Sequence, residues 1–158
     1  MSIWRPHTTG ILIGGLVAIL IALVASFMLS HFKPTTQVSL GSGVFSVKVA
    51  TNDIERERGL SGVDKLGSLE GLLMVFEADG QHGIWMKDMK IPIDIVWLDK
   101  DRTVVYMVTD ASPQLSTDKT FTSKDPALYV LELSAGSIQK SGIKIGSKAE
   151  FVLEGEPQ

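Results

Sequence analysis

A run of 19 uncharged, mostly apolar residues near the N-terminus constrains this chain more than any other feature. The run occupies residues 11–29 and reads ILIGGLVAILIALVASFML. As an α-helix it would extend roughly 28 Å, which is close to the hydrocarbon thickness of a bilayer. The sequence therefore predicts a short N-terminal segment (1–10), a transmembrane helix acting as a signal anchor (11–32), a linker (33–37) and one domain (38–158).

A cleaved signal peptide is the alternative interpretation of the same run. The apolar region of such a peptide is usually about 7–15 residues long and ends in small residues around the cut site. Here the run is longer and leads into FMLSHFK, which favours a retained anchor. The lipid bilayer is then a partner of residues 11–32, and residues 34–158 lie outside the cytoplasm, either periplasmic or extracellular. After cleavage the same residues would be secreted.

Charge and cysteine content exclude several kinds of function for the domain. The whole chain has a formal net charge of −3, and residues 34–158 hold all 18 acidic residues and every basic residue except Arg5 and Lys33. An acidic domain argues against a nucleic-acid partner. The chain has no cysteine, so disulfides and thiolate chemistry are excluded.

Alternating hydrophobicity predicts a mainly β domain. Short helices are expected at 52–59, where Asn52 and Glu55 resemble a capping box and Gly59 a stop, and at 135–142. A polar loop is expected at 111–126. The expected strands are 44–50, 71–77, 83–89, 93–99, 103–110, 127–133 and 148–154, the first of them preceded by a hairpin turn at 41–43. Many short strands with one or two brief helices are typical of an antiparallel β-sandwich or barrel-like fold.

Asp94 is the anomalous residue of the expected strand 93–99. Alternation places Ile93, Ile95 and Trp97 on one face and Asp94, Val96 and Leu98 on the other, so both faces are largely apolar and the strand is expected to be covered on both sides. A buried carboxylate costs several kcal/mol unless it is paired or hydrogen-bonded. Asp94 therefore either accepts backbone or arginine hydrogen bonds in a structural role, which we favour, or faces a pocket as a binding group or general base.

The preceding expected strand, 83–89, presents Trp85 and Lys87 on one face. This could be the rim of a ligand-binding site, or the lysine stem could simply lie over the indole ring. His82, just before the strand, could be a catalytic or metal-binding group or a solvated loop residue. The nearby acids lack diagnostic ligand spacing, so neither a metal nor a cofactor is predicted.

Glu132 is a second carboxylate in a β environment, flanked by Leu131 and Leu133. Asp94 and Glu132, with His82 assisting, could form the acid–base pair of a glycosidase-like hydrolase. Arg58 belongs to the ERER run at 55–58, most simply a solvated helix face, although an inward arginine could meet Asp94. Nucleotide-binding and serine-hydrolase motifs are absent.

Several motifs together resemble one uncharacterised family. The segments ERERGLSG, GLLMVFE, HGIWMKDM, IPIDIVWLD and YVLELSAGS are similar, in order and spacing, to the family called domain of unknown function 192, over roughly residues 38–153. The resemblance implies a small β-sandwich or barrel-like domain, often behind a signal peptide or anchor, and no established activity. The family's characteristic positions map onto Arg58-Gly59-Leu60, His82, Trp85-Met86, Asp94 and Glu132-Leu133. Where many members have Lys-Asn-Thr after Trp-Met, this chain has Lys87-Asp88-Met89, and it lacks the cysteine that many members carry before the YVLEL strand.

The leading functional interpretation is a membrane-anchored extracytoplasmic domain that binds a small ligand, a glycan or an envelope partner. Its expected binding residues are Arg58, Trp85, Lys87 and Asp94. The alternatives are the hydrolase that uses Asp94 and Glu132, and a structural accessory domain without a site. The observation that best separates the binding domain from the hydrolase is whether Asp94, His82, Trp85 and Glu132 line one pocket.

Overall fold

The computed structural model describes residues 17–21, 35–115 and 119–153 and divides the chain into two compact units, 1–33 and 34–158. In the first unit, residues 17–21 are helical. Across the described ranges, no helix has both the length and the apolar character needed to cross a membrane. Most of the predicted transmembrane helix, residues 11–32, lies outside the described residues.

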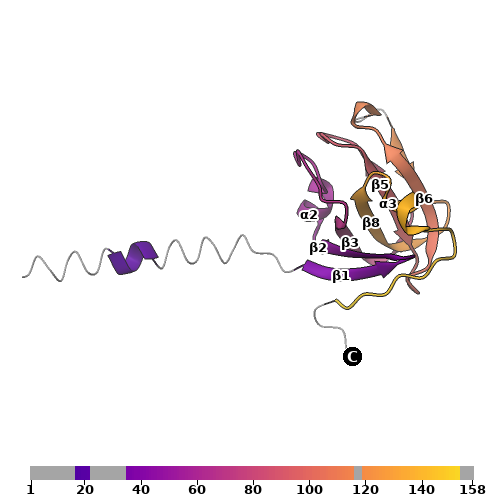
Figure 1. Cartoon of the computed structure of the whole chain (residues 1–158), viewed down its shortest axis with the longest axis horizontal. Coiled ribbons are helices and arrows are strands. Elements are labelled where there is room, and N and C mark those ends of the chain that lie inside the picture. The colour runs from indigo at the N-terminus through magenta and orange to yellow at the C-terminus, as the bar shows by residue number, and fades with distance from the viewer. Residues whose placement is uncertain (1–16, 22–34, 116–118, 154–158) are drawn as a thin grey trace, which may run out of the picture. The chain divides into compact units, whose positions relative to one another are not determined.

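The second unit is mainly β, as predicted, and contains eight described strands (Figure 1). Six form one sheet in the order β1-β2-β3-β8-β5-β6, and β4 and β7 form a two-stranded sheet. The strands are β1 (Thr35–Leu40), β2 (Gly43–Ala50), β3 (Glu70–Gly80), β4 (Gly83–Trp85), β5 (Ile93–Leu98), β6 (Val104–Ala111), β7 (Thr120–Thr122) and β8 (Ala127–Ser134). The helices are α2 (Asp53–Arg58), α3 (Ser137–Ser141) and a 3-10 turn, η1 (Pro113–Leu115).

The large sheet is mixed, which corrects the prediction of an antiparallel sandwich or barrel. β1 and β2 form the expected antiparallel hairpin, but β2 and β3 are parallel. The connection from 51 to 69, which contains α2, is long enough for a parallel crossover. Among the described strands the order runs from β1 at one edge to β6 at the other without closing into a barrel.

Within the predicted final strand, 148–154, the described residues 148–153 make isolated bridges in place of a strand, one to each edge region of the large sheet. Glu150 bridges Ser39 in β1, and Lys148 bridges Thr103 next to β6. Backbone hydrogen bonds support both bridges. Ser39 and Glu150 each donate an N–H to the carbonyl of the other at 2.9 Å, and the Ala149 N–H donates to the Arg102 carbonyl at 2.9 Å. The segment thus covers part of both sheet edges.

The predicted strand 83–89 is shorter than expected and leaves the large sheet. It ends at Trp85, and Asp88 adopts a positive φ of 56°, which breaks an extended strand. Its partner is β7, which lies inside the predicted loop 111–126. β4 and β7 thus form a small separate sheet.

The central strand β5 confirms the predicted separation of side chains onto two faces. All six of its residues are buried. Ile93, Ile95 and Trp97 join one hydrophobic cluster, while Val96 and Leu98 join the other. The large sheet therefore has a core on each side.

Helix α2 begins and ends where the sequence predicts. The Asn52 side chain accepts a hydrogen bond from the Glu55 N–H at 3.0 Å, and Gly59 follows the last turn with φ 51° and ψ −132°. The Glu55 carboxylate accepts from the N–H of Thr51, the residue before the cap, at 3.2 Å. A positive φ favours glycine, so Gly59 fixes the point at which the chain leaves the helix.

Candidate functional site

Asp94 is fully buried and both of its oxygens are used by the backbone. Oδ1 accepts from the Asp110 N–H at 2.9 Å, and Oδ2 accepts from the Ile138 N–H at 2.8 Å. The carboxylate therefore ties β5 to the end of β6 and to α3. These bonds come from the backbone and not from an arginine, and they support the structural interpretation of Asp94.

Asp94 and Glu132 lie on opposite faces of the sheet. In the β5–β8 ladder Glu132 pairs with Ile95, and Asp94 pairs with Leu133. Paired residues of a ladder project to the same face and their neighbours project to the other. The two carboxyl groups cannot converge on one cleft, so the predicted Asp94–Glu132 acid–base pair is wrong.

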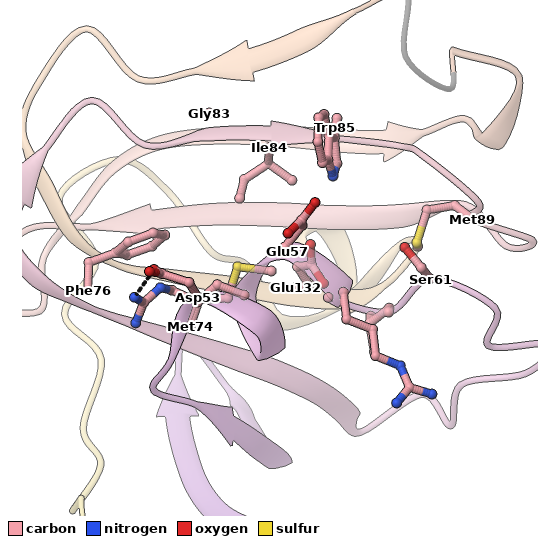
Figure 2. A pocket seen from close by; sticks show the side chains of 14 residues that line it. Asp53, Glu57, Ser61, Met74, Phe76, Gly83, Ile84, Trp85, Met89 and Glu132 are labelled. Atoms are coloured by element: carbon pink, nitrogen blue, oxygen red, sulfur yellow. Dashed lines mark hydrogen bonds and ion pairs between the residues drawn. The ribbon is translucent and has the colours of Figure 1, made fainter.

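Glu132 instead borders a cavity of about 320 Å³ between α2, its following turn, β3 and β4 (Figure 2). This is the lower end of the usual range for small-molecule pockets, about 300–1,000 Å³. The lining residues are Asp53, Arg56, Glu57, Arg58, Gly59, Leu60, Ser61, Met74, Phe76, Gly83, Ile84, Trp85, Met89 and Glu132. Most of the wall is apolar, and its charged groups come from α2 and β8.

The Glu132 carboxyl group is buried and only partly hydrogen-bonded. The residue is 3% exposed, and its Oε2 has no hydrogen-bond partner among the described residues. Burial raises the pKa of Glu132 from 4.5 to about 7, and a hydrogen bond from the Leu60 N–H partly opposes that rise. A buried polar atom without a partner costs free energy, so Oε2 can gain by meeting a ligand.

Gly59 leaves space beside this carboxyl group. A Cβ atom at Gly59 would lie 3.4 Å from Glu132 Oε2 and 3.3 Å from Met74 Cε. Any larger side chain would enter the cavity next to the carboxyl. The glycine that ends α2 therefore also keeps the floor of the cavity open.

Helix α2 supplies four charged residues to the wall, and one of its arginines is fully engaged. Arg56 donates to the carbonyls of Thr51 and Val75 at 2.7 and 2.8 Å, and it forms an ion pair with Asp53 at 2.5 Å. Its guanidinium also lies 5.2 Å from the Phe76 ring centroid. Neither Arg56 nor the exposed Arg58 meets Asp94, so that sequence-based suggestion is wrong.

Glu57 is a cavity residue that the sequence analysis missed. The ERER run predicts a solvated helix face, and Glu57 is indeed exposed. It nevertheless lines the cavity, and Figure 2 shows its carboxylate, like that of Glu132, beneath Ile84 and Trp85. The helical phase of α2 was predictable, but its placement against β3 and β8 was not.

Trp85 forms part of the rim of the cavity, and the Lys87 side chain lies over its ring. Trp85 is 40% exposed, and the Lys87 ammonium lies 5.4 Å from its ring centroid, as the lysine-over-indole interpretation predicts. Lys87 itself does not line the cavity. Its carbonyl accepts from Ser61 Oγ at 2.8 Å, which links the turn after α2 to the segment that follows β4.

His82 packs outside the cavity. Its ring stacks on Phe76 with centroids 3.5 Å apart, its Nε2 lies 3.1 Å from the Ala78 carbonyl, and its own carbonyl accepts from Trp97 Nε1 at 2.8 Å. These contacts give His82 a packing role. Within the described ranges no group of three or more histidine, aspartate or glutamate side chains could hold a metal ion.

The structure thus separates the predicted site residues into three groups. Arg58, Trp85 and Glu132 meet at one cavity. Asp94, on the other face, borders a different hollow that includes Asp110 and Gln139, and His82 and Lys87 contact the cavity only through their neighbours.

Comparisons with known proteins agree with this fold. The DUF192 family, described as "Uncharacterized ACR", matches residues 36–151. A crystal structure from Sinorhizobium meliloti 1021, named as a "putative transcription regulator", is 26% identical with a TM-score of 0.71, covering 75% of this chain and 95% of that chain. A protein of unknown function from Novosphingobium aromaticivorans DSM 12444 is 30% identical with a TM-score of 0.67, covering 73% of this chain and 83% of that one. No curated protein matches significantly.

Proposed function

The chain belongs to the DUF192 family, and from that premise we propose that its β domain binds a small ligand in the cavity beside Glu132. The observation that carries the proposal is the buried Glu132 Oε2, which borders the cavity and has no hydrogen-bond partner among the described residues. A concave, mostly apolar pocket with a few polar groups at defined positions is the usual form of a small-molecule site. The raised pKa of Glu132 supports the same assignment.

The motif positions that carry the family resemblance also support this site. Three of the matching segments contribute to one wall: Arg58-Gly59-Leu60 from α2 and its turn, Trp85 from β4, and Glu132 from β8. These segments are far apart in the sequence and meet only in the fold. Core packing alone does not require an exposed arginine and a half-exposed tryptophan in such a set.

We further propose that residues 11–32 anchor the domain in a membrane with residues 34–158 outside the cytoplasm. The support is the uncharged run at 11–29. Protease treatment of intact cells, or of spheroplasts where an outer membrane is present, should degrade the domain. Protection that persists until the cytoplasmic membrane is broken would contradict this orientation.

DNA binding gains no support from this acidic domain, although the name of the Sinorhizobium protein assigns regulation of transcription to that protein.

The binding proposal can be tested on residues 34–158 alone. Residues 34–158 form a compact unit of their own, and the Sinorhizobium chain, which the match covers to 95%, was crystallised; we therefore expect this domain to fold alone. A thermal-shift screen of small metabolites and envelope glycans should give at least one compound that raises the midpoint of unfolding, because a ligand that binds the folded state stabilises it.

Two variants locate the binding. Trp85→Ala should reduce the ligand-induced rise in the midpoint of unfolding because it removes part of the rim. Gln139 is an exposed residue of the hollow on the Asp94 face, so Gln139→Ala should leave that rise unchanged. A screen without any stabilising compound, or a shift that Gln139→Ala abolishes and Trp85→Ala preserves, would contradict the proposal.

A further inference from the structure

The cavity beside Glu132 presents a buried acceptor at its floor, an exposed acceptor at its mouth and, among the described residues, few free side-chain donors. The Glu132 and Glu57 carboxyl groups both border the space beneath Trp85 (Figure 2). Two of the side-chain donors that line the cavity are already used: Arg56 bonds two carbonyls and Asp53, and Ser61 Oγ donates to the Lys87 carbonyl. Among the described lining residues, the Arg58 guanidinium and the Trp85 indole N–H remain, both on exposed residues.

This arrangement selects between two kinds of polar ligand. A sugar hydroxyl both donates and accepts hydrogen bonds, so a sugar bound deeply needs donors as well as acceptors around it. An ammonium group carries three donors and no acceptor. The floor of the cavity therefore suits a cation better than it suits a polyol.

The hydrogen bonding of Glu132 further distinguishes an ammonium from a guanidinium. The Leu60 N–H already donates to this carboxyl group, and only Oε2 is without a partner among the described residues. A guanidinium prefers two parallel bonds to both carboxylate oxygens, whereas an ammonium is a compact donor that one oxygen satisfies. The apolar walls from Met74 and Ile84 and the Trp85 ring would surround the alkyl part of such a ligand.

We propose that this cavity binds a primary ammonium group on an alkyl chain, with Glu132 Oε2 as its buried acceptor and Glu57 as a second acceptor at the mouth. This inference rests on the proposed ligand-binding function and names the chemistry of its ligand. The same group occurs on free alkylamines and diamines and on lysine side chains.

NMR titration of ¹⁵N-labelled residues 34–158 tests the chemistry directly. The probes are n-butylamine and putrescine, with 1-butanol and 1,4-butanediol as uncharged counterparts, and Nα-acetyl-lysine methylamide for the lysine source. The amines should shift the Trp85 indole and Gly59 signals at concentrations at least tenfold below those at which the alcohols do. Tighter binding of the lysine derivative than of the free amines would identify a protein side chain as the source, and the reverse order would identify a free amine.

The pH dependence of amine binding supplies a second readout. An ammonium binds the ionised carboxyl, and the pKa of Glu132 is about 7, so the ionised fraction and the affinity should rise about tenfold from pH 6 to pH 8. The other charged groups at the cavity are Asp53, Arg56, Glu57 and Arg58, all from α2; β3 and β4 contribute none to its wall.

Two variants separate the roles of the carboxyl groups. Glu132→Gln should weaken amine binding at least tenfold and remove its pH dependence. Glu57→Gln should weaken amine binding a few-fold and leave its pH dependence in place.

The outcomes separate this inference from the broader proposal. Alcohols that bind as well as amines, or amine binding that Glu132→Gln leaves intact, would overturn the ammonium assignment while leaving a ligand site in place. If no amine binds but another compound in the wider screen does, the ammonium assignment is likewise overturned and the ligand site stays in place. Failure of both experiments would remove the site itself.

Discussion

Two buried carboxyl groups on neighbouring strands of one sheet have opposite environments. On one face, Asp94 uses both oxygens to accept backbone N–H groups from the end of β6 and from α3. On the other face, Glu132 keeps one oxygen without a partner among the described residues and borders a cavity. The difference shows that burial alone does not identify a functional acid. What distinguishes the two is whether the fold itself supplies the hydrogen bonds.

The largest effect should follow from removing the satisfied acid. Asp94→Ala would leave the N–H groups of Asp110 and Ile138 buried without an acceptor, each at about 1–3 kcal/mol. We expect the free energy of unfolding to fall by about 4 kcal/mol, measured by urea denaturation. As a control, Asp101→Ala removes an exposed turn carboxylate and should change stability by less than about 0.5 kcal/mol. A loss below about 1 kcal/mol for Asp94→Ala would show that the two faces do not differ as described.

Glu132→Gln should have a smaller effect of opposite sign. Below pH 4.5 the carboxyl is protonated in both the folded and the unfolded chain, so the variant and the parent should be equally stable. Between pH 4.5 and about 7 the unfolded chain releases a proton that the folded chain retains, and the parent loses stability as the pH rises. Above pH 7 the variant should be more stable by about 3 kcal/mol.

Urea denaturation of parent and variant at pH 4, 6 and 8 measures this difference. Glu57→Gln serves as the control, because its side chain is exposed and should change stability little at any of these values. A gap between parent and Glu132→Gln that is independent of pH would mean that Glu132 does not titrate in this window, and the contrast with Asp94 would then rest on hydrogen bonding alone.

The smallest effect concerns the space beside Glu132 rather than its charge. Gly59→Ala adds a methyl group within 3.4 Å of Met74 Cε and Glu132 Oε2 at a positive φ, and it should cost about 2 kcal/mol. Gly62→Ala is matched to it, because Gly62 also has a positive φ but meets nothing within 4 Å, so its cost should be about 1 kcal/mol. Thermal unfolding measures both, and equal losses would show that the cavity floor tolerates the added atom.

Local sequence patterns predicted much of this fold because they report on neighbours along the chain. The alternation from Ile93 to Leu98 assigned each side chain to the correct face. The Asn52 cap and Gly59 gave the limits of α2. The same reasoning identified Asp94 as a buried acid that needs partners, and it favoured the structural role that the hydrogen bonds support.

Relations between distant segments were not available from such patterns. The register of β5 against β8 decides that Asp94 and Glu132 face apart, and no local signal encodes it. The parallel β2–β3 pair and the departure of β4 toward β7 likewise depend on tertiary packing. Glu57 was missed for the same reason, since a solvated residue on a short helix becomes a cavity residue only when another strand lies opposite.

The bridging of Lys148 and Glu150 to the two edge regions of the sheet has a practical consequence for handling this protein. Removing the chain from residue 146 onward would free backbone donors and acceptors beside β1 and β6 at once, and exposed strand edges readily pair with other molecules. Such a truncated product would be prone to self-association even though its central strands were untouched. Tags and fusions therefore belong beyond residue 153, where they leave this cover in place.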